Sequence, residues 1–415
     1  MSQDLPVAEG TPARKGALVF IFAACLMDII AIGIIIPVLP KLVEEFVGGD
    51  LVSAAHYLGL FGTMWALMQF FASPVLGALS DRFGRRPILL ISIFGLGLDY
   101  VLMALAPNLA WLFVGRLISG ITSASFATAG AYIADVTPPE NRAKNFGLIG
   151  AAFGIGFVIG PALGGVLGDI DPRLPFWVAA GLALVNGLYG LFVLPESLPK
   201  DRRSPFRWSK ANPIGSLQLL RAYPGLLGLA ATFFLYMLAQ QVMQTTFVLY
   251  TGYRYDWTAA SVGLYLGAIG VGSIIVQTLL VGRVVKRVKS RGALLIGLAC
   301  GSIGFAIFAT APTGAFFYMG VPIFALSGLV QAGYQGLMST RVSPREQGRL
   351  QGTNSVIMGL AGMMGPALFS ASFAWSIGPG QALHMPGLAI YLASALVASA
   401  LAMAAWSGRA RPDAA

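Results

Sequence analysis

Long apolar stretches recur along the chain, and a short polar or charged segment separates each from the next. A helix needs roughly 20 mainly apolar residues to cross a bilayer. Because hydrocarbon offers the backbone no hydrogen-bond partner, each stretch must pair its own amide groups and is predicted to be a helix. The pattern therefore predicts an all-α polytopic membrane protein with twelve transmembrane helices. The predicted spans are residues 17–38, 56–79, 88–106, 109–134, 144–168, 175–194, 224–250, 258–282, 293–312, 315–340, 350–376 and 384–406.

One long polar interruption divides these spans into six and six. It predicts an N-terminal six-helix half at residues 1–194, a cytoplasmic linker at 195–223 and a C-terminal six-helix half at 224–415. The halves repeat each other at a constant offset, which indicates two parallel six-helix repeats. In such transporters the substrate lies near mid-membrane between the repeats, and access alternates between the two sides. The matched pairs include Gly77 with Gly282, Arg82 with Arg287, Gly160 with Gly365 and Pro161 with Pro366.

The composition agrees with a membrane protein. Of the 415 residues 56% are hydrophobic and only 11% are charged, which is more apolar surface than one soluble core could bury. The formal charge of +10 follows position, because 23 of the 27 Lys and Arg residues fall on one side of the predicted spans. This bias predicts a multi-pass protein of the bacterial inner membrane with both termini in the cytoplasm. It also explains the positive charge without a nucleic-acid partner.

The polar segment between the second and third spans combines glycine, an acid and arginines at a fixed spacing. Glycines permit a tight turn and a close helix approach, and the acid can face an arginine or a helix N-terminus. Charge bias alone would explain the arginines but not the Gly–Asp–Gly spacing. Because such contacts can form and break as two halves move, the segment is a candidate gating loop. Its residues are Gly77, Asp81, Arg82, Gly84, Arg85 and Arg86.

The fifth span carries glycines at every fourth position. Glycines at i, i+4 and i+8 form a flat face on which another helix can pack closely, and a proline among them bends the helix. We expect this span to pack unusually close to a neighbour. The residues of the pattern are Gly156, Gly160, Pro161, Gly164 and Gly165.

Three charged residues lie well inside predicted spans: Asp28, Asp99 and Arg116. A charge in hydrocarbon is costly unless it faces a partner or a wet cavity, so each is a functional candidate. Burial favours the protonated form of a carboxyl group and a nearby guanidinium favours the charged form, so such a group can exchange a proton as access changes. We hypothesise that Asp28 carries the proton with Arg116 as its modulator. Asp99 then supports substrate binding or the same relay, although hydrogen bonding to a neighbouring helix stays open for both acids.

Amides in the spans are candidates for substrate contacts. Interhelical hydrogen bonding accounts for many such residues, but span seven holds several at helical spacings. We expect Gln241 or Gln244 to line the cavity.

Two of these patterns resemble motifs of the major facilitator superfamily. The loop at residues 77–87 resembles its signature loop, in which the acid and an arginine act as a latch on the outward-facing state. The second-half copy at 282–287 has Lys286 in place of the acid, so any latch is carried mainly by the first half. Span five resembles the superfamily's antiporter motif, which occurs in drug/proton exporters.

The whole chain most closely resembles the tetracycline/proton antiporter family, most clearly over residues 25–170. The resemblance implies a major facilitator fold that exports a small lipophilic or zwitterionic drug against protons. It also implies that the proton gradient supplies the energy without a cofactor, and that the protein functions as a monomer. By the same resemblance Asp28 and Asp99 are the transport acids, and Gln69 is a polar contact in span two, with His56 and Gln335 as further substrate candidates. The resemblance is carried by Asp28, Gly33, Pro37 and Pro40, by His56–Tyr57, Met68–Phe70 and Asp99–Tyr100, and by residues 129–135, 335–339, 347–348 and 351–352.

One departure concerns span nine. Antiporters of this family have an intramembrane Asp there, whereas residues 299–302 read Ala-Cys-Gly-Ser, and no acid lies within any predicted second-half span. This leaves proton coupling to the carboxylates of the first half. The resemblance therefore supports a drug exporter of the tetracycline type more strongly than tetracycline itself as the cargo.

Two alternatives remain open. A sugar or metabolite exporter would keep the fold and change the cargo. A membrane enzyme or sensor is the alternative of another class, but the chain has only two His and two Cys residues, no ATP-binding glycine loop and no long soluble segment. These absences also argue against a metal site.

Overall fold

The computed structural model describes residues 12–122, 125–137, 142–206, 208, 217–343 and 346–407. Within that part the chain is almost entirely helical and contains no strand. The first-half helices are α1 (Pro12–Ile35), α2 (Leu39–Phe46), α3 (Leu51–Phe83), α4 (Arg85–Ala104), α5 (Leu109–Thr122), α6 (Ser125–Val136), α7 (Arg142–Ile170) and α8 (Leu174–Val193). Both chain termini, on which the predicted orientation partly depends, lie outside the described residues.

Later elements begin with a 3-10 turn at Lys200–Arg202 and a short helix α9 (Gln218–Ala222). The second-half helices are α10 (Pro224–Gln240), α11 (Val242–Thr245), α12 (Phe247–Tyr255), α13 (Ala259–Ile275), α14 (Val281–Thr310), α15 (Gly314–Met319), α16 (Val321–Ala325), α17 (Leu329–Ser339), α18 (Gln347–Ile377) and α19 (Leu388–Ser407). A π-helical turn at Val276–Leu280 joins α13 to α14, and 3-10 turns lie at Leu326–Gly328 and Gln381–Leu383.

The predicted all-α membrane architecture is confirmed. Ten helical stretches among the described residues are long and apolar enough to cross a membrane, and α5 is a shorter apolar helix. One of the ten, Ala259–Thr310, has 52 residues, more than twice the length of one crossing. It holds predicted spans eight and nine, and its backbone leaves helical geometry at Lys289, where φ is 57°. Span four consists of α5 and α6.

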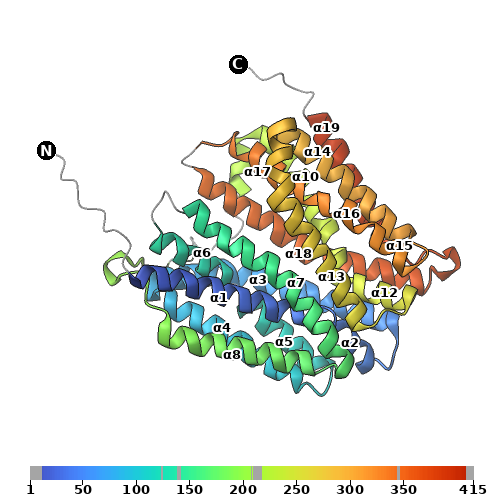
Figure 1. Cartoon of the computed structure of the whole chain (residues 1–415), viewed down its shortest axis with the longest axis horizontal. Coiled ribbons are helices and arrows are strands. Elements are labelled where there is room, and N and C mark those ends of the chain that lie inside the picture. The colour runs from blue at the N-terminus through green and yellow to red at the C-terminus, as the bar shows by residue number, and fades with distance from the viewer. Residues whose placement is uncertain are drawn as a thin grey trace.

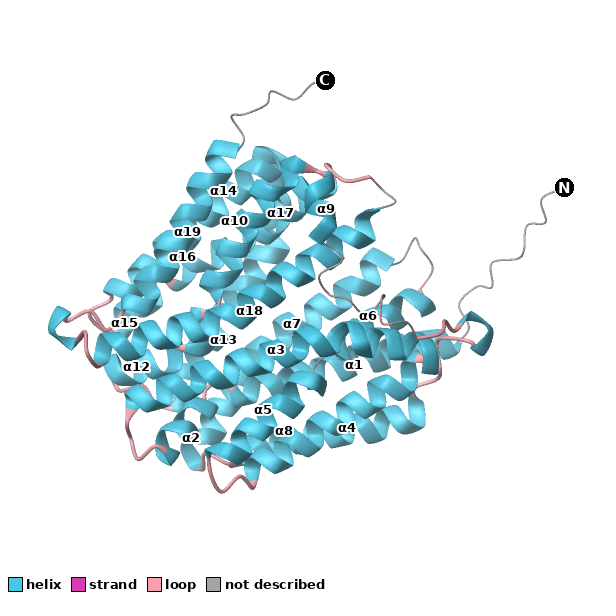
Figure 2. Cartoon of the chain, turned by 180° about the vertical axis from the view of Figure 1, so that it is seen from behind, coloured by secondary structure: helices cyan, strands magenta, loops and turns pink. Residues whose placement is uncertain are grey.

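The helices form two bundles that meet along the centre of the molecule (Figure 1). Across the boundary, α7 packs along α13 and α3 packs along α18. We call the end with the loop at residues 77–87 the motif face, and the end with the turns at 47–50, 171–173 and 256–258 the far face. Figures 1 and 2 show the bundles closest where α2 and α12 lie, at the far face, and spread apart towards α6 and α17.

Local sequence explains the main helix ends. Asp50 caps α3, because its side chain accepts a hydrogen bond from the backbone N–H of Val52 at 3.1 Å. Gly84 separates α3 from α4 with a φ of 109°, a backbone conformation that other residues rarely adopt. Thr258 caps α13 by accepting from the N–H of Ser261.

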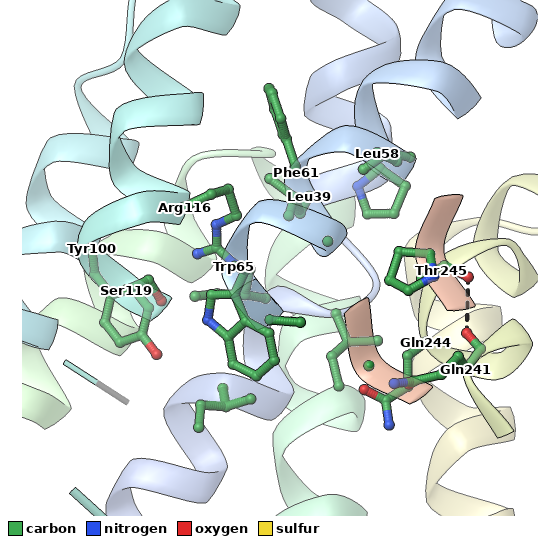
Figure 3. A pocket seen from close by; sticks show the side chains of 18 of the residues that line it. Leu39, Leu58, Phe61, Trp65, Tyr100, Arg116, Ser119, Gln241, Gln244 and Thr245 are labelled. Atoms are coloured by element: carbon green, nitrogen blue, oxygen red, sulfur yellow. Dashed lines mark hydrogen bonds between the residues drawn. The ribbon is translucent and has the colours of Figure 1, made fainter. Parts of the chain in front are cut away.

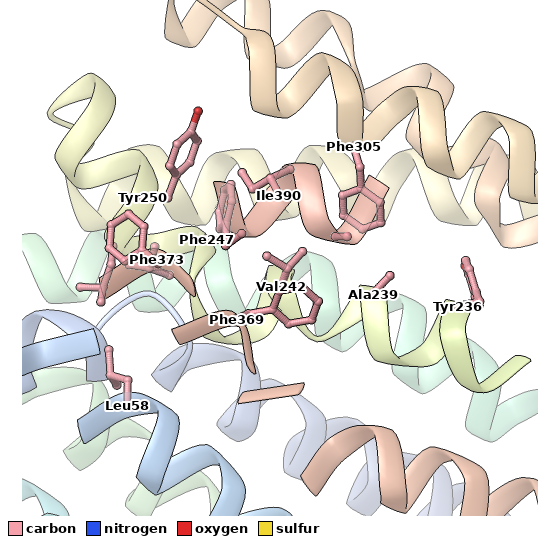
Figure 4. Close-up of a cluster of buried hydrophobic side chains, with 14 of the residues drawn as sticks. Leu58, Tyr236, Ala239, Val242, Phe247, Tyr250, Phe305, Phe369, Phe373 and Ile390 are labelled. Atoms are coloured by element: carbon pink, nitrogen blue, oxygen red, sulfur yellow. The ribbon is translucent and has the colours of Figure 1, made fainter. Parts of the chain in front are cut away.

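A large apolar core supports the second half. It includes buried aromatic side chains of α12, α14 and α18, among them Phe247, Phe305 and Phe373 (Figure 4). The same cluster extends to Leu58 of α3 in the first half.

Candidate functional site

A cavity of about 190 Å³ lies between the two halves, from mid-bundle towards the far face (Figure 3). Its wall is mainly apolar and includes Phe61 and Phe157 from the first half and Pro366 from the second. A concave apolar site with a few polar groups is typical of small-molecule binding. The polar or amphipathic residues of the lining are Trp65, Tyr100, Arg116, Ser119, Gln241, Gln244 and Thr245.

Arg116 is the charged side chain among the described residues that line this cavity. Its Nη2 lies 3.9 Å from Oδ2 of Asp99, which stands behind it on α4. The Asp99 side chain has no exposed surface, whereas that of Arg116 is 13% exposed. A direct charge-assisted hydrogen bond would measure about 2.7–2.9 Å, so this ion pair is loose. Arg116 also contacts the sulfur of Met103 at 3.0 Å.

Ser119 is a hydrogen-bonding neighbour of the buried Asp99 carboxyl group, but neither Asp99 oxygen has a hydrogen bond of good geometry among the described residues, and Nε of Arg116 has none there either. Buried polar atoms in proteins are nearly always paired. The pair thus has hydrogen-bonding capacity that its neighbours leave unused, and its Arg116 member lines the cavity.

Asp28 occupies a separate buried position between α1 and α8. The amide nitrogen of Asn186 donates to Oδ1 of Asp28 at 3.1 Å and to the carbonyl oxygen of Ala24 at 3.2 Å. Asp28 is 5% exposed and does not line the cavity. Arg116 therefore lies beside Asp99, and its hypothesised role as the modulator of Asp28 stays a prediction.

The predicted substrate contacts divide into two groups. Gln241 and Gln244 line the cavity, where α10 ends and α11 begins (Figure 3). Gln69, His56 and Gln335 lie outside its lining. His56 is exposed on α3 and Gln69 is half-buried. Gln335 lies on α17, where its amide oxygen accepts from Gln351 at 3.5 Å.

Arg85 organises the predicted gating loop. Its guanidinium lies 2.6 Å from Oδ1 of Asp81 and 3.1 Å from Oδ2 of Asp135 on α6. Its backbone N–H donates to Oε1 of Glu196 at 2.8 Å, just after α8. A Cβ at Gly84 would overlap the Glu196 carboxylate, so only glycine fits there. All these partners belong to the first half or to the start of the linker.

The remaining candidate residues of the loop are Gly77, Arg82 and Arg86. Arg86 donates to the backbone carbonyl of Leu191 at 2.6 Å, which ties the loop to α8. The Arg82 guanidinium lies over the Phe83 ring at 5.0 Å from its centroid. A Cβ added at Gly77 would meet nothing within 4 Å. The hydrogen bonds and ion pairs of this loop given above stay within the first half and the start of the linker.

The glycine pattern of α7 lies against two helices. An added Cβ would meet Ile29 from Gly156, Gly33 from Gly160 and the carbonyl of Ile34 from Gly164, all on α1. From Gly165 it would meet the backbone of Ala259 on α13, in the second half. Pro161 lies inside α7, and its carbonyl lies against Gly263 of α13. The pattern thus lets α7 contact both halves at backbone distance.

At the motif face a hydrogen bond ties the end of the linker to α18. The Tyr223 hydroxyl donates to Oε2 of Glu346 at 2.6 Å. This bond is the main cause that holds the pKa of Glu346 below its usual value. The linker therefore contacts both halves: its Glu196 binds Arg85 of the first half, and its Tyr223 binds Glu346 of the second.

Sequence reasoning missed Trp65, Ser119 and Asn186. Trp65 and Ser119 line the cavity, and Asn186 holds Asp28. Asn186 carried a usable signal, because it is an amide in the middle of an otherwise apolar predicted span. Trp65 and Ser119 carried none, since aromatic and hydroxyl side chains are ordinary in membrane helices.

Comparisons with known proteins agree with this architecture. Residues 21–366 match the model of the Major Facilitator Superfamily. Among solved structures, the human organic anion transporter MFSD10 is similar with a TM-score of 0.71 at 22% identity, covering 95% of this chain and 100% of that one. A bacterial homologue of the human lysosomal transporter Spinster, in an inward-facing and occupied conformation, has a TM-score of 0.74 at 15% identity and covers 97% and 98%. At these identities the likeness shows the fold alone.

Curated relatives are more similar in sequence. The class C tetracycline resistance protein of Escherichia coli is 38% identical over 95% of this chain and 98% of its own length. The class G protein of Vibrio anguillarum is 38% identical over 88% and 92%, and the class H protein of Pasteurella multocida is 35% identical over 87% and 90%. The chain therefore belongs to the major facilitator superfamily, among the tetracycline resistance proteins.

Proposed function

We propose that this protein is a proton-coupled antiporter that exports a small lipophilic or zwitterionic drug of the tetracycline type by alternating access. The observation that carries the proposal is the ion pair on the cavity wall, where Arg116 faces the cavity and Asp99 is buried behind it. The curated tetracycline resistance relatives support the cargo class. The mainly apolar lining supports a lipophilic cargo over a sugar.

The loose pair suggests how a proton and a cargo exclude each other. While Asp99 is charged, it attracts Arg116 to the wall and leaves the cavity free for cargo. When Asp99 takes a proton, that attraction is lost and the guanidinium is free to move into the cavity. Its charge and volume then disfavour a bound cargo. Mutual exclusion of this kind is what exchange, as opposed to co-transport, requires.

Asp28 is a second carboxyl group that can hold a proton in the same half. Its distance from the cavity lining and its hydrogen bond from Asn186 favour a relay or structural role over direct contact with cargo. Because no acid lies within a predicted second-half span, we assign proton coupling to Asp99 and Asp28 of the first half.

The charge bias supports an orientation in the bacterial inner membrane. Most basic residues, including those of the loop at 77–87, fall on the motif face, which we assign to the cytoplasm together with both termini. The halves contact each other mainly towards the far face, so the described conformation suits loading from the cytoplasm. We propose that one chain suffices for transport, because the cavity is formed within it.

Transport into inside-out vesicles tests this proposal. With an imposed pH gradient, acid inside, we expect tetracycline to accumulate and a protonophore to abolish the accumulation. A matched set of neutral sugars should neither accumulate nor compete. Proton-dependent accumulation of a sugar without that of tetracycline would retain the fold and replace the cargo. Vesicles from cells that lack the protein serve as the control for leakage and nonspecific binding.

A further inference from the structure

A carboxylate joins the two halves at the far face. Asp169, in the last turn of α7, accepts hydrogen bonds from the backbone N–H groups of Ala259 at 2.9 Å and Ala260 at 3.3 Å. These are the first residues of α13, whose N-terminal N–H groups have no partner inside their own helix and carry partial positive charge. An acid of the first half therefore caps a helix of the second.

A cation stands beside the same carboxylate. Nζ of Lys41, on the short helix α2, lies 3.9 Å from Oδ1 of Asp169. Both side chains are about one-third exposed, 34% for Lys41 and 33% for Asp169, so the group lies at the edge of the bundle and not in its interior. Salt and solvent can reach this junction, which suits a contact that has to break in each transport cycle.

Backbone packing surrounds the capped helix end. A Cβ added at Gly165 would overlap the carbonyl of Ala259, and one at Gly168 would lie 3.4 Å from the Ala259 Cβ. A Cβ at Gly263 would overlap the carbonyl of Pro161. The ends of α7 and α13 thus meet without intervening side chains, and cargo cannot pass between them until they separate.

The acid of the motif face is differently engaged. Asp81 forms its ion pair with Arg85 in its own half, and its backbone carbonyl accepts from the N–H of Ser204 at 3.0 Å. Added Cβ atoms at Gly77 and Gly348 would meet nothing within 4 Å. In this conformation the charge contact between the halves is therefore made at the far face, by Asp169.

We propose that Asp169 is the latch of the far face, which holds that face closed by capping α13 and must release it before cargo can leave. Lys41 shields the carboxylate and orients it towards the helix end. The proposal concerns the closure of one face, and it depends neither on the identity of the cargo nor on which acid carries the proton.

Asp169→Asn tests the latch, because it keeps the shape of the side chain and removes the charge. Loss of the charge weakens two hydrogen bonds to a helix N-terminus, and we expect the ratio of far-face-open to far-face-closed molecules to rise by about tenfold or more. Asp171→Asn is the matched control. Its carboxylate lies two residues further along and accepts from the N–H of Arg173 at 2.7 Å within the same half.

The measurement is the labelling rate of a cysteine placed in the cavity. In a background of Cys25→Ala and Cys300→Ala, Leu58→Cys reports on access from the far face, because Leu58 lines the cavity and is only 6% exposed. A membrane-impermeant maleimide is added to vesicles from the far-face side. We expect labelling about tenfold faster with Asp169→Asn than with wild type or Asp171→Asn.

A second measurement separates opening from misfolding. A pocket at the far face is lined by Glu45 of α2 from the first half and by Gly252 of α12 from the second. Spin labels at Glu45→Cys and Gly252→Cys should show a longer distance in Asp169→Asn. They should show the wild-type distance in Asp169→Glu, which keeps the charge. Equal labelling rates and equal distances in wild type, Asp169→Asn and Asp171→Asn would overturn the proposal. Labelling of Asp169→Glu as fast as that of Asp169→Asn would also overturn it, since the charge at residue 169 would then have no effect on opening.

Discussion

A guanidinium in the hydrocarbon region needs compensation, and Arg116 obtains it from two sources. Placing Arg at the centre of a membrane helix costs about 2.5–3.5 kcal/mol on insertion scales. The Asp99 carboxylate lies 3.9 Å away, and the cavity wall leaves part of the side chain open to water. The attraction of Asp99 depends on whether its carboxyl group is charged, and the access of water depends on whether cargo fills the cavity. A single residue therefore responds to both ligands of the proposed exchange.

Removal of the Arg116 charge should separate these two responses. We expect Arg116→Gln to lower proton-driven tetracycline transport by at least about tenfold, because a proton on Asp99 then no longer changes the position of a charge at the cavity wall. Arg116→Lys should retain part of the activity, since it keeps the charge but not the planar, delocalised head group. Uptake into vesicles at equal protein levels is the measurement. Wild-type transport by Arg116→Gln would contradict the role of this pair.

Asn186 provides a second test at the scale of one residue. Asn186→Leu removes the donor to Oδ1 of Asp28 and leaves that buried oxygen without this partner, whereas the Ala24 carbonyl keeps its bond within α1. A buried acceptor left unpaired costs about 1–3 kcal/mol, so a clear drop in the melting temperature of the purified protein is expected. Asn186→Ser, which keeps a donor, should melt closer to wild type. Unchanged melting of Asn186→Leu would show that Asp28 finds another partner.

The sequence identified Asp28, Asp99 and Arg116, because a charge within an apolar span is conspicuous. It could not identify which acid faces Arg116, since hydropathy does not determine the rotation of a helix about its axis. Gln69 and Gln335, which the family resemblance named as substrate candidates, lie outside the cavity lining in this conformation. The direction in which each polar side chain points depends on how its helix packs against its neighbours, and only the structure gives that.

At the scale of helices, α7 contacts both halves at backbone distance. Its glycines at positions 156, 160 and 164 lie against α1, and Gly165 lies against α13. Close backbone approach replaces side-chain packing here, as small residues commonly allow in membranes. A helix with this face cannot accept a larger residue without moving away from α1 or α13.

Substitution of these glycines should depend on what they face. In Gly164→Ala the new methyl group would overlap the backbone of Ile34, so we expect lower thermal stability and loss of most transport. Gly150→Ala is a matched control on the same helix, because its Cβ would meet nothing within 4 Å. The control should be neutral or stabilising by up to about 1 kcal/mol, as expected from helix propensity. Equal effects of the two substitutions on melting and uptake would refute the packing argument.

Hydropathy predicted the helical spans well, because their length and apolarity are set by the bilayer. It missed the interruption of span seven, predicted as one stretch at 224–250. The structure divides it into α10, α11 and α12, with breaks at Gln241 and Thr246. No proline or glycine marks these breaks, so local sequence gave no signal. Gln241 and Gln244, which line the cavity, lie at and just after the first break.

At the scale of the molecule, the two faces differ in how the halves meet. At the far face α7 and α13 are joined through Asp169 and through glycine contacts. At the motif face Arg85 keeps Asp81 within the first half. The internal repeat predicted two halves and a site between them, but a pattern that is shared by both states of a transporter cannot indicate which face is open.

The central claim is that a proton on Asp99 and a bound cargo exclude each other through Arg116. The most direct test is the affinity of the purified protein for tetracycline as a function of pH, for wild type, Asp99→Asn and Asp28→Asn. If one proton excludes one cargo, the wild-type Kd rises by about tenfold per pH unit on the acid side of the titration. Asp99→Asn, which mimics the protonated form, should bind weakly at every pH. An unchanged pH dependence in Asp99→Asn, with its loss in Asp28→Asn, would contradict the claim and assign the proton to Asp28.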